Sequence, residues 1–560
     1  MHLRKIIFIA ATSLINIFAN AQQDYKGWHL LDNKKDNLHG ISLQQTYELV
    51  KGKKSKQVIV AVIDTGVDTT HEDLKGVLWT NIKEISGNGK DDDGNGYIDD
   101  VHGWNFIGGK DGRNIEKESA EATRIFHRYK EKFYNKQIVE NELSPGDKVE
   151  FTLWKKAASL LEIDKDEHIS IMFLEVAYKA AKKHEKILKQ ELKKDTFNIE
   201  VVEKFEPQTQ LARQAKMGYL NFIKITGIDK EETNESVFSQ LEEYLQDRKS
   251  AIEAKDVAPV NYREDIVKDE YYNINDRFYG NSDIMGPLPM HGTHVSGIIA
   301  AQRNNNIGMD GVADNVKIMS IRAVPEGDEY DKDVALAIKY AVDNGAKVIN
   351  MSFGKGISPE KKWVDEAVKY AELKDVLLVH AAGNDGKNND ETESFPNKQL
   401  KTYNSTASNF ISVGASSDIA ISNDLVAEFS NYGVKSVDVF APGVKIYSTL
   451  PGGNVYGFQK GTSMAAPVVS GVAALIRSYF PLLSARQVKY VIERSVEKED
   501  TVFVTKPGSK EKVFLSELSS SGGTLNAYNA MKLAATLKPE NKEVIKEILP
   551  KSSLKKITLN

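Results

Sequence analysis

The 560-residue chain contains no cysteine, so it can form neither a disulfide nor a lipid-modified N-terminal cysteine. Without disulfides, an exported fold would depend on its core and on other staples, such as bound cations. The chain also lacks a marked charge excess, since its formal net charge is −5 and its basic and acidic residues are interspersed. This balance gives no indication that nucleic acid or an acidic membrane surface is a partner.

Long apolar runs are absent except near the N-terminus. There, Arg4 and Lys5 precede an apolar run over residues 6–18, and Ala19-Asn20-Ala21 has the small-x-small pattern of a cleavage site. This arrangement predicts a secretory signal peptide over residues 1–21. A membrane anchor is the alternative, but the run is short for a spanning helix and no second run follows. We therefore expect a secreted protein, periplasmic or extracellular, with no membrane span after cleavage.

Short aliphatic runs alternate with helical patterns in residues 58–109 and 276–535. The runs at 58–63, 348–351 and 376–379 show no apolar–polar alternation. Runs of this kind are typical of strands buried on both faces of a parallel sheet. Their alternation with helices predicts an α/β sandwich over these two parts of the chain.

The other segments differ in composition. Residues 22–57 form a polar lead-in, and residues 536–560 form a lysine-rich tail with few core-type residues. Residues 110–275 are rich in lysine and glutamate, lack aliphatic runs, and repeat apolar residues at helical spacing, for example at Leu174 and Ala181. We expect this segment to be a helical insertion into the α/β domain, with its charged residues on solvated helix faces.

The first candidate for chemistry is Asp64, which closes the run 58–63 and precedes Thr65-Gly66. A buried strand would carry its carboxylate to the carboxyl edge of the sheet, where α/β folds place active sites. An aspartate before a turn is also common as a partner of backbone N–H groups. On this motif alone, both roles remain open.

Two histidines begin an apolar helical pattern in His291-Gly292-Thr293-His294, which continues to Ala300. A histidine pair on a helix can bind a metal, but this pair lacks the spacing and the glutamate of the zinc-peptidase pattern H-E-x-x-H. We expect His291 to act as a general base and His294 to be a packed neighbour.

A serine and an asparagine complete the set. Ser463 lies among small residues in Gly461-Thr462-Ser463, where a helix begins, so a substrate backbone can approach it closely. Its N–H and the helix dipole would favour an oxyanion, although a serine here can also be only an N-cap. Asn384 follows Ala382-Gly383 after the run 376–379, and it is either a second oxyanion donor or a turn residue.

Taken together, these motifs and the chain order Asp64, His291, Ser463 resemble the signature motifs of the subtilase family of serine peptidases. The resemblance covers residues 36–109 and 276–535. It implies a three-layer sandwich, with a mostly parallel sheet flanked by helices, and an endopeptidase that cleaves protein or peptide substrates through an acyl-enzyme. Ser463 would attack, His291 would transfer the proton and Asp64 would orient the imidazole, while Asn384 would stabilise the oxyanion.

The resemblance also extends to substrate binding. Ser352, Phe353 and Gly354 match the strand that pairs with an extended peptide, and Ala381, Ala382 and Gly383 match the opposite wall of the pocket. Asp385 would lie near the mouth of this pocket. We expect it to favour neutral or basic substrate side chains.

Structural calcium is the cofactor that the resemblance implies. Residues 302–313 are similar to the calcium loop of the family, and Asp73 matches its acidic ligand. The loop would supply the Asn305 side chain and backbone carbonyls, a set of hard oxygen ligands that suits calcium. These carbonyls belong to Arg303, Ile307 and Met309.

A second acidic segment, residues 91–100, begins like an EF-hand loop. Its candidate ligands are Asp91, Asp93, Asn95 and Asp99. His102 stands where an EF-hand needs a bidentate glutamate, which argues against a true EF-hand. A calcium loop of another geometry and a simple acidic turn both remain open.

Two features depart from the family pattern. Residues 22–57 are few for a folded inhibitory propeptide, and the insertion at 110–275 separates the Asp64 and His291 motifs. The insertion could cap the cleft, restrict substrates or bind a partner. The main alternative function is therefore a catalytically latent family member that binds a partner through its insertion, and a second is acyl transfer to an amine.

Overall fold

The protein is described from a computed structural model that covers residues 25–162, 165–226, 233–499 and 501–540. The expected signal peptide over residues 1–21 lies outside the described residues, as does most of the predicted tail. Within the described ranges, no helix is long and apolar enough to span a membrane.

A seven-stranded sheet forms the centre of the molecule, in the order β2-β3-β1-β4-β5-β8-β9. Each strand is parallel to its neighbours. The strands are β1 (Val58–Asp64), β2 (Gly103–Asn105), β3 (Val316–Arg322), β4 (Val348–Met351), β5 (Leu377–Ala381), β8 (Phe410–Ser416) and β9 (Val439–Pro442). All their carboxyl ends therefore meet at one edge of the sheet.

Helices cover both faces of the sheet. Val60 and Val62 of β1 pack into the core under α10 (Met290–Ala300) and α14 (Thr462–Tyr479). Ala61 and Ile63 of the same strand pack into the core under α11 (Asp331–Asp343) and α12 (Lys361–Leu373). Because both faces of β1 are buried, its sequence is apolar at consecutive positions. The predicted three-layer α/β sandwich is confirmed.

The lead-in, predicted to be a polar segment, instead belongs to the main core. The Trp28 side chain is fully buried, and its Nε1 donates to the carbonyls of Val444 and Lys445, each at 3.1 Å. Ile41 and Leu43 enter the same core as α14. A few large apolar residues in a polar segment thus suffice to attach it. The lead-in contains the 3₁₀ turn Trp28–Leu30, α1 (Asn33–Asp36) and α2 (Leu43–Val50). The C-terminal helices α15 (Ala485–Arg494) and α16 (Ala527–Ala534) also contribute to this core.

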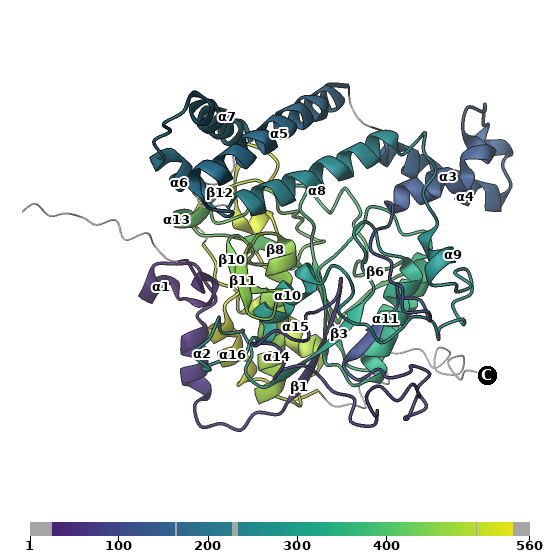
Figure 1. Ribbon diagram of the computed structural model, residues 1–560. Coiled ribbons are helices and arrows are strands. Elements are labelled where there is room, and N and C mark those ends of the chain that lie inside the picture. The colour runs from purple at the N-terminus through teal and green to yellow at the C-terminus, as the bar shows by residue number, and fades with distance from the viewer. Residues whose placement is uncertain (1–24, 163–164, 227–232, 500, 541–560) are drawn as a thin grey trace, which may run out of the picture.

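Between β2 and α10 the described chain is helical (Figure 1). Its helices are α3 (Glu121–Phe133), α4 (Pro145–Leu160), α5 (Lys165–Leu192), α6 (Ile199–Lys204), α7 (Gln210–Thr226), α8 (Asn234–Glu253) and α9 (Tyr262–Ile266), with a 3₁₀ turn at Glu140–Glu142. In the view of Figure 1, α5, α7 and α8 lie above the sheet. They share a core that includes Ala181, Tyr219 and Phe238.

The other end of the insertion packs against the sheet domain. Phe126 of α3 and Ala157 of α4 share a small core with Ile357, which follows β4 in the chain. Ile115, which precedes α3, is part of the core under α11 and α12. The helical segment between β2 and α10 is therefore continuous with the sheet domain at α3 and α4 and has a core of its own around α5, α7 and α8.

The remaining elements are short. They are three antiparallel pairs, one helix and two 3₁₀ turns: β6 (Gln399–Leu400) with β7 (Ser405–Thr406), β10 (Ile446–Leu450) with β11 (Val455–Gln459), β12 (Phe503–Thr505) with β13 (Lys512–Phe514), α13 (Ile419–Ser422), Lys401–Tyr403 and Leu515–Glu517. The start of the predicted tail is bound rather than loose, because Gln487 Nε2 donates to the Lys538 carbonyl at 2.7 Å and Arg486 pairs with Glu540 at 2.8 Å.

Candidate active site and calcium sites

Asp64 is the last residue of β1, at the carboxyl edge of the sheet, and is 2% exposed. Its Oδ1 accepts from Thr65 N at 2.8 Å and lies 2.7 Å from His291 Nδ1. Two glycines make this approach possible. A Cβ at Gly66 would lie 2.2 Å from a backbone oxygen, and a Cβ at Gly292 would lie 2.2 Å from the Gly66 carbonyl.

His291 is the second residue of α10, and its side chain is 31% exposed. Because Nδ1 faces the Asp64 carboxylate, Nε2 is the nitrogen that can exchange a proton with a substrate-side group. His294, one turn further on, is fully buried with Nε2 3.2 Å from the Gly457 carbonyl. Burial lowers the pKa of His294 to about 3, so it stays neutral and packs in the core, as predicted.

Ser463 is the second residue of α14 and lies beside the end of β4. Its Oγ donates to the Ser352 carbonyl at 3.0 Å, and Ser352 Oγ donates to the Ser463 carbonyl at 2.9 Å. Pro467 lies inside this helix rather than in its first turn. Because proline has no N–H, the carbonyl four residues earlier, that of Ser463, loses its helical donor. The Ser352 hydroxyl supplies a donor in its place.

Two polar residues that the sequence analysis did not assign extend this connection. Asn350, inside β4, donates through Nδ2 to Ser352 Oγ at 2.9 Å and accepts from Ser470 Oγ at 2.8 Å. Asn350 and Ser470 are both fully buried. A polar residue within an otherwise aliphatic strand is the sequence signal that could have found Asn350. The chain of hydrogen bonds fixes the start of α14 on the sheet edge.

Asn384 follows β5 and faces the start of α14. Its Oδ1 accepts from Thr462 N and from Thr462 Oγ1, both at 2.9 Å, and Gly383 N donates to the same Thr462 hydroxyl at 3.1 Å. These contacts fix the oxygen end of the amide, so its Nδ2 is the end that remains to donate. Thr462 is a further positioning residue that the sequence analysis did not assign.

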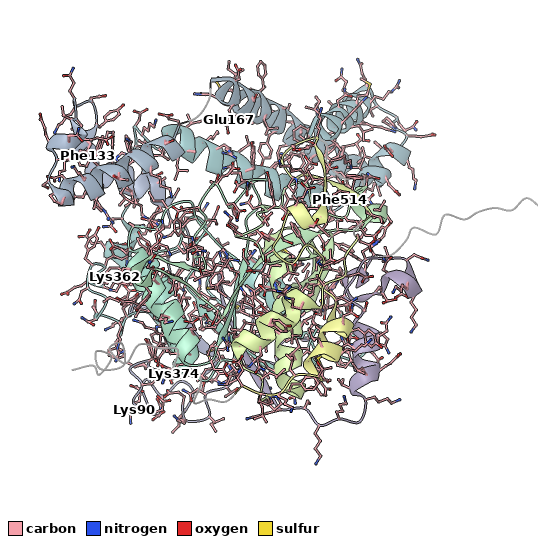
Figure 2. All side chains as sticks on the ribbon, turned by 180° about the vertical axis from the view of Figure 1, so that it is seen from behind. Lys90, Phe133, Glu167, Lys362, Lys374 and Phe514 are labelled. Atoms are coloured by element: carbon pink, nitrogen blue, oxygen red, sulfur yellow. The ribbon has the colours of Figure 1, made fainter. Side chains whose placement is uncertain are left out.

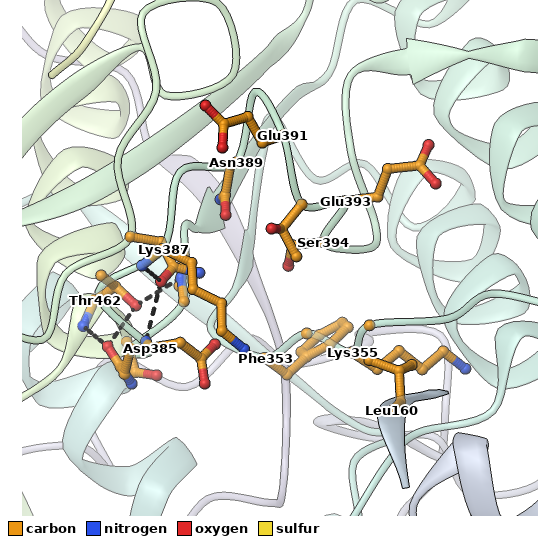
Figure 3. Close-up of a pocket in the computed structure, with 18 of the residues that line it drawn as sticks. Leu160, Phe353, Lys355, Asp385, Lys387, Asn389, Glu391, Glu393, Ser394 and Thr462 are labelled. Atoms are coloured by element: carbon orange, nitrogen blue, oxygen red, sulfur yellow. Dashed lines mark hydrogen bonds between the residues drawn. The ribbon is translucent and has the colours of Figure 1, made fainter. Parts of the chain in front are cut away.

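Ser463 and Asn384 line a cavity of about 590 Å³ (Figure 3). Of the residues predicted to bind substrate, Ser352, Phe353, Gly354 and Gly383 line the same cavity. The backbone of Phe353 is fixed by a hydrogen bond, because His380 Nε2 lies 2.8 Å from its carbonyl. This imidazole is buried, which lowers the pKa of His380 to about 4.

The prediction that Ala382 forms part of the pocket wall is wrong. Ala382 is fully buried, and its carbonyl accepts from Asn389 Nδ2 at 2.8 Å and from Asn431 Nδ2 at 3.1 Å. Ala381 and Gly383, on either side of it in the predicted wall, do line the cavity. The reason is that successive side chains along an extended segment point in opposite directions.

The predicted calcium loop surrounds Asp73, which is fully buried. Asp73 Oδ1 contacts Asn305 Nδ2, and Asp73 Oδ2 accepts from Met309 N at 3.2 Å and Tyr456 OH at 3.0 Å. The Ile307 N–H donates to the Asn305 side chain, at 3.1 Å from its Oδ1.

Arg303, whose carbonyl was the remaining predicted ligand, directs its guanidinium away to the Gly311 carbonyl at 2.6 Å. Among the residues that the structure describes, the buried Asp73 carboxylate has no basic ion-pair partner. The buried Asp73 carboxylate, the Asn305 amide oxygen and the nearby carbonyls are hard oxygen ligands of the kind that calcium takes, whereas the N–H groups that contact Asp73 and Asn305 cannot coordinate a cation.

The acidic segment 91–100 is a second candidate, and the structure changes its ligand set. Carboxylate oxygens of Asp91, Asp93 and Glu84 lie within 4.8 Å of one another. Glu84 is 9% exposed, and its buried Oε2 has no hydrogen-bond partner in the described part of the chain. The sequence analysis missed Glu84, which stands outside the aspartate-rich pattern.

One of the predicted ligands lies elsewhere: Asp99 caps a separate turn, where it accepts from Asn88 N at 3.1 Å and Gly89 N at 2.9 Å. Asn95 stays beside the cluster, because its N–H donates to Asp91 Oδ1 and Asp93 Oδ1, both at 3.1 Å, while its Nδ2 donates to Asp100 at 3.0 Å. In the rear view, Lys90 in this loop lies at the opposite end of the molecule from Glu167 in the insertion (Figure 2).

With this geometry established, comparisons with known proteins identify the family. The profile of the Subtilase family matches residues 55–517, and the chain belongs to this family. The chain is 37% identical over 262 residues to the thermophilic serine proteinase of Bacillus sp. (strain AK1), which covers 46% of this chain and 55% of that protein.

It is also 30% identical over 416 residues to the cell wall-associated protease of Bacillus subtilis, which covers 71% of this chain and 43% of that protein. Subtilisin DY of Bacillus licheniformis is 42% identical over 203 residues, or 36% of this chain and 67% of subtilisin DY. The chain thus spans about half the length of the first two relatives.

Proposed function

We propose that this protein is a secreted serine endopeptidase that hydrolyses peptide bonds through an acyl-enzyme on Ser463. The observation that carries the proposal is the 2.7 Å contact between Asp64 Oδ1 and His291 Nδ1 at the sheet edge where Ser463 and Asn384 line one cavity. Family membership supports peptide-bond hydrolysis, and the predicted signal peptide supports export. Protein or peptide chains are the proposed substrates.

In the proposed reaction, Ser463 Oγ attacks the carbonyl carbon and passes its proton to His291 Nε2. The Ser463 hydroxyl, which donates to the Ser352 carbonyl at 3.0 Å, must first turn its O–H towards His291 Nε2. Asp64 holds the Nδ1–H and stabilises the imidazolium that forms. His291 then protonates the leaving amine, and a water molecule, deprotonated by the same Nε2, hydrolyses the ester and restores Ser463.

Two donors are proposed to stabilise the oxyanion. The Ser463 N–H lies at the N-terminus of α14, where the helix dipole favours negative charge. Asn384 Nδ2 is the second donor, because Thr462 occupies the oxygen end of its amide. Donors fixed before the reaction need no reorganisation when the charge develops.

We also propose that calcium stabilises the fold at two loops. Asp73, Asn305 and the backbone of residues 303–309 would hold one ion, and Glu84, Asp91 and Asp93 the other. Calcium would neutralise the buried carboxylates and bind segments that are distant in the sequence. These sites take no part in the proposed chemistry.

The test compares the purified protein with its Ser463→Ala variant on casein and on short peptides. Loss of the triad serine lowered kcat by about 2 × 10⁶ in a related subtilisin. We therefore expect no measurable activity in the variant and covalent labelling of wild type alone by a fluorophosphonate probe. Folded wild-type protein with neither activity nor labelling would instead support the latent, partner-binding alternative.

A further inference from the structure

Two residues of the insertion line the cavity that contains Ser463. Lys156 and Leu160 lie on the last turn of α4, four residues apart and therefore on one face of the helix. A Cβ at Gly356 would lie 3.4 Å from Leu160 Cδ1, and Figure 3 shows Leu160 close to Phe353 and Lys355. One wall of the cavity thus comes from the insertion and not from the sheet domain.

The charged groups of this cavity are balanced. Three lysines and three acidic residues line it: Lys156, Lys355, Lys387, Asp385, Glu391 and Glu393. Lys156 Nζ lies 3.3 Å from Glu393 Oε2 and 5.1 Å from the centre of the Phe395 ring. Glu393 also pairs with Lys401, so the carboxylate at the end of the cavity next to α4 is neutralised by two lysines. Such a lining favours an uncharged substrate side chain.

A buried ion cluster fastens the insertion to the adjoining wall, which residues 352–356 form. Lys355, which follows Gly354 directly, places its Nζ 2.9 Å from Glu121 Oε2, 3.0 Å from Asp331 Oδ1 and 2.6 Å from the Glu329 carbonyl. Glu121 is the first residue of α3. The start of the insertion is therefore bound to the segment that forms the adjoining wall of the cavity, and the contacts of Ile357 reinforce this attachment.

We propose that the insertion determines substrate specificity: α4 forms the far wall of the pocket for the side chain that precedes the cleaved bond, and Leu160 and Lys156 select large uncharged side chains there. This inference rests on the proposed peptidase function. A cavity of about 590 Å³ is far larger than a small side chain needs. Leu160 supplies an apolar contact that a phenylalanine or leucine reaches and an alanine does not.

The first test measures kcat/KM of Leu160→Ala on peptides that differ only at this substrate position. We expect the ratio of the phenylalanine to the alanine substrate to fall about 10-fold, because a lost apolar contact in a pocket has an effect of this order. Leu160 is 47% exposed, so truncation should leave the fold intact. Val149→Ala is the matched control, since Val149 lies on the same helix and is 69% exposed. An unchanged ratio in Leu160→Ala would overturn the proposal.

The second test changes charge and does not depend on the first variant. Lys156→Glu should raise the ratio of the arginine to the glutamate substrate by about 10-fold or more, because two carboxylates then face the pocket end. Lys155→Glu makes the same charge change next to it, where Lys155 pairs with Glu140 at 2.6 Å outside the cavity. Equal shifts in both variants would indicate a general field effect and would overturn the role of α4 as a wall.

Failure of the underlying function is separable from failure of this inference. Fluorophosphonate labelling of Ser463 and cleavage of the alanine substrate report on the peptidase itself. If wild type shows neither, the proposed function fails. If wild type shows both and the Leu160 and Lys156 variants keep the wild-type preferences, only the specificity role of the insertion fails.

Discussion

Replacing Glu121 with glutamine would deprive Lys355 of one of the two carboxylates that it contacts. Both side chains of the Glu121–Lys355 pair are 1% exposed, and loss of one partner from a buried ion pair costs about 3–5 kcal/mol. Burial opposes ionisation of Glu121, but Lys355 and Arg124 outweigh it and lower its pKa from 4.5 to about 2. This difference corresponds to about 3 kcal/mol, in agreement with the first value.

The pH dependence of this contribution has a definite sign. Because folding lowers the pKa of Glu121, the ionised pair stabilises the fold fully above pH 4.5, and this stabilisation is lost as the pH falls towards about 2. We expect Glu121→Gln to lower the free energy of unfolding by about 3 kcal/mol at pH 7. The difference from wild type should shrink between pH 4.5 and pH 2.

Urea unfolding in the Ser463→Ala background measures this effect without self-digestion. Glu140→Gln is the matched control, because Glu140 pairs with Lys155 at an exposed site and should contribute less than about 1 kcal/mol. If Glu121→Gln and Glu140→Gln cost the same small amount, the buried cluster does not hold the insertion in place, and the reasoning is refuted.

Three further predictions concern the oxyanion, the lead-in and calcium. In steady-state kinetics, Asn384→Ala should lower kcat by about 10²–10³ with little change in KM, because loss of one oxyanion donor has this effect in a subtilisin. An unchanged kcat would mean that the amide is only a turn residue. Trp28→Ala should destabilise the fold by about 3–5 kcal/mol in urea unfolding, whereas a loss below 1 kcal/mol would mean that the lead-in is not part of the core. Excess calcium at about 100 times its Kd should stabilise the protein by about 2.7 kcal/mol per site, as read from melting curves with and without chelator. Asp73→Asn and Glu84→Gln should each remove part of that effect, and a melting curve that is insensitive to chelator in wild type would exclude both sites.

The predictions of the fold and of the three proposed catalytic residues came from short local patterns in the sequence. Strands buried on both faces must be apolar at consecutive positions, so β1 was visible as an uninterrupted run, and the confirmed sandwich followed from such runs. Asp64, His291 and Ser463 were visible because each stands in a short motif of small residues. The three residues are far apart in the chain. Asp64 ends β1, and His291 and Ser463 lie at the start of α10 and α14, so all three meet at the edge of the sheet where the parallel strands end.

Only the tertiary structure decided the contacts between segments without a motif. Trp28 enters the main core, Glu84 joins the aspartate loop, and Lys156 and Leu160 reach the cavity from an insertion whose sequence indicates only helices. Of the predicted wall 381–383, the Ala382 side chain turns away from the pocket because of the direction of the chain at that point. The physical reason is the same in each case: such contacts depend on where distant elements pack against one another, and packing leaves no periodic or local signal in the segments that it joins.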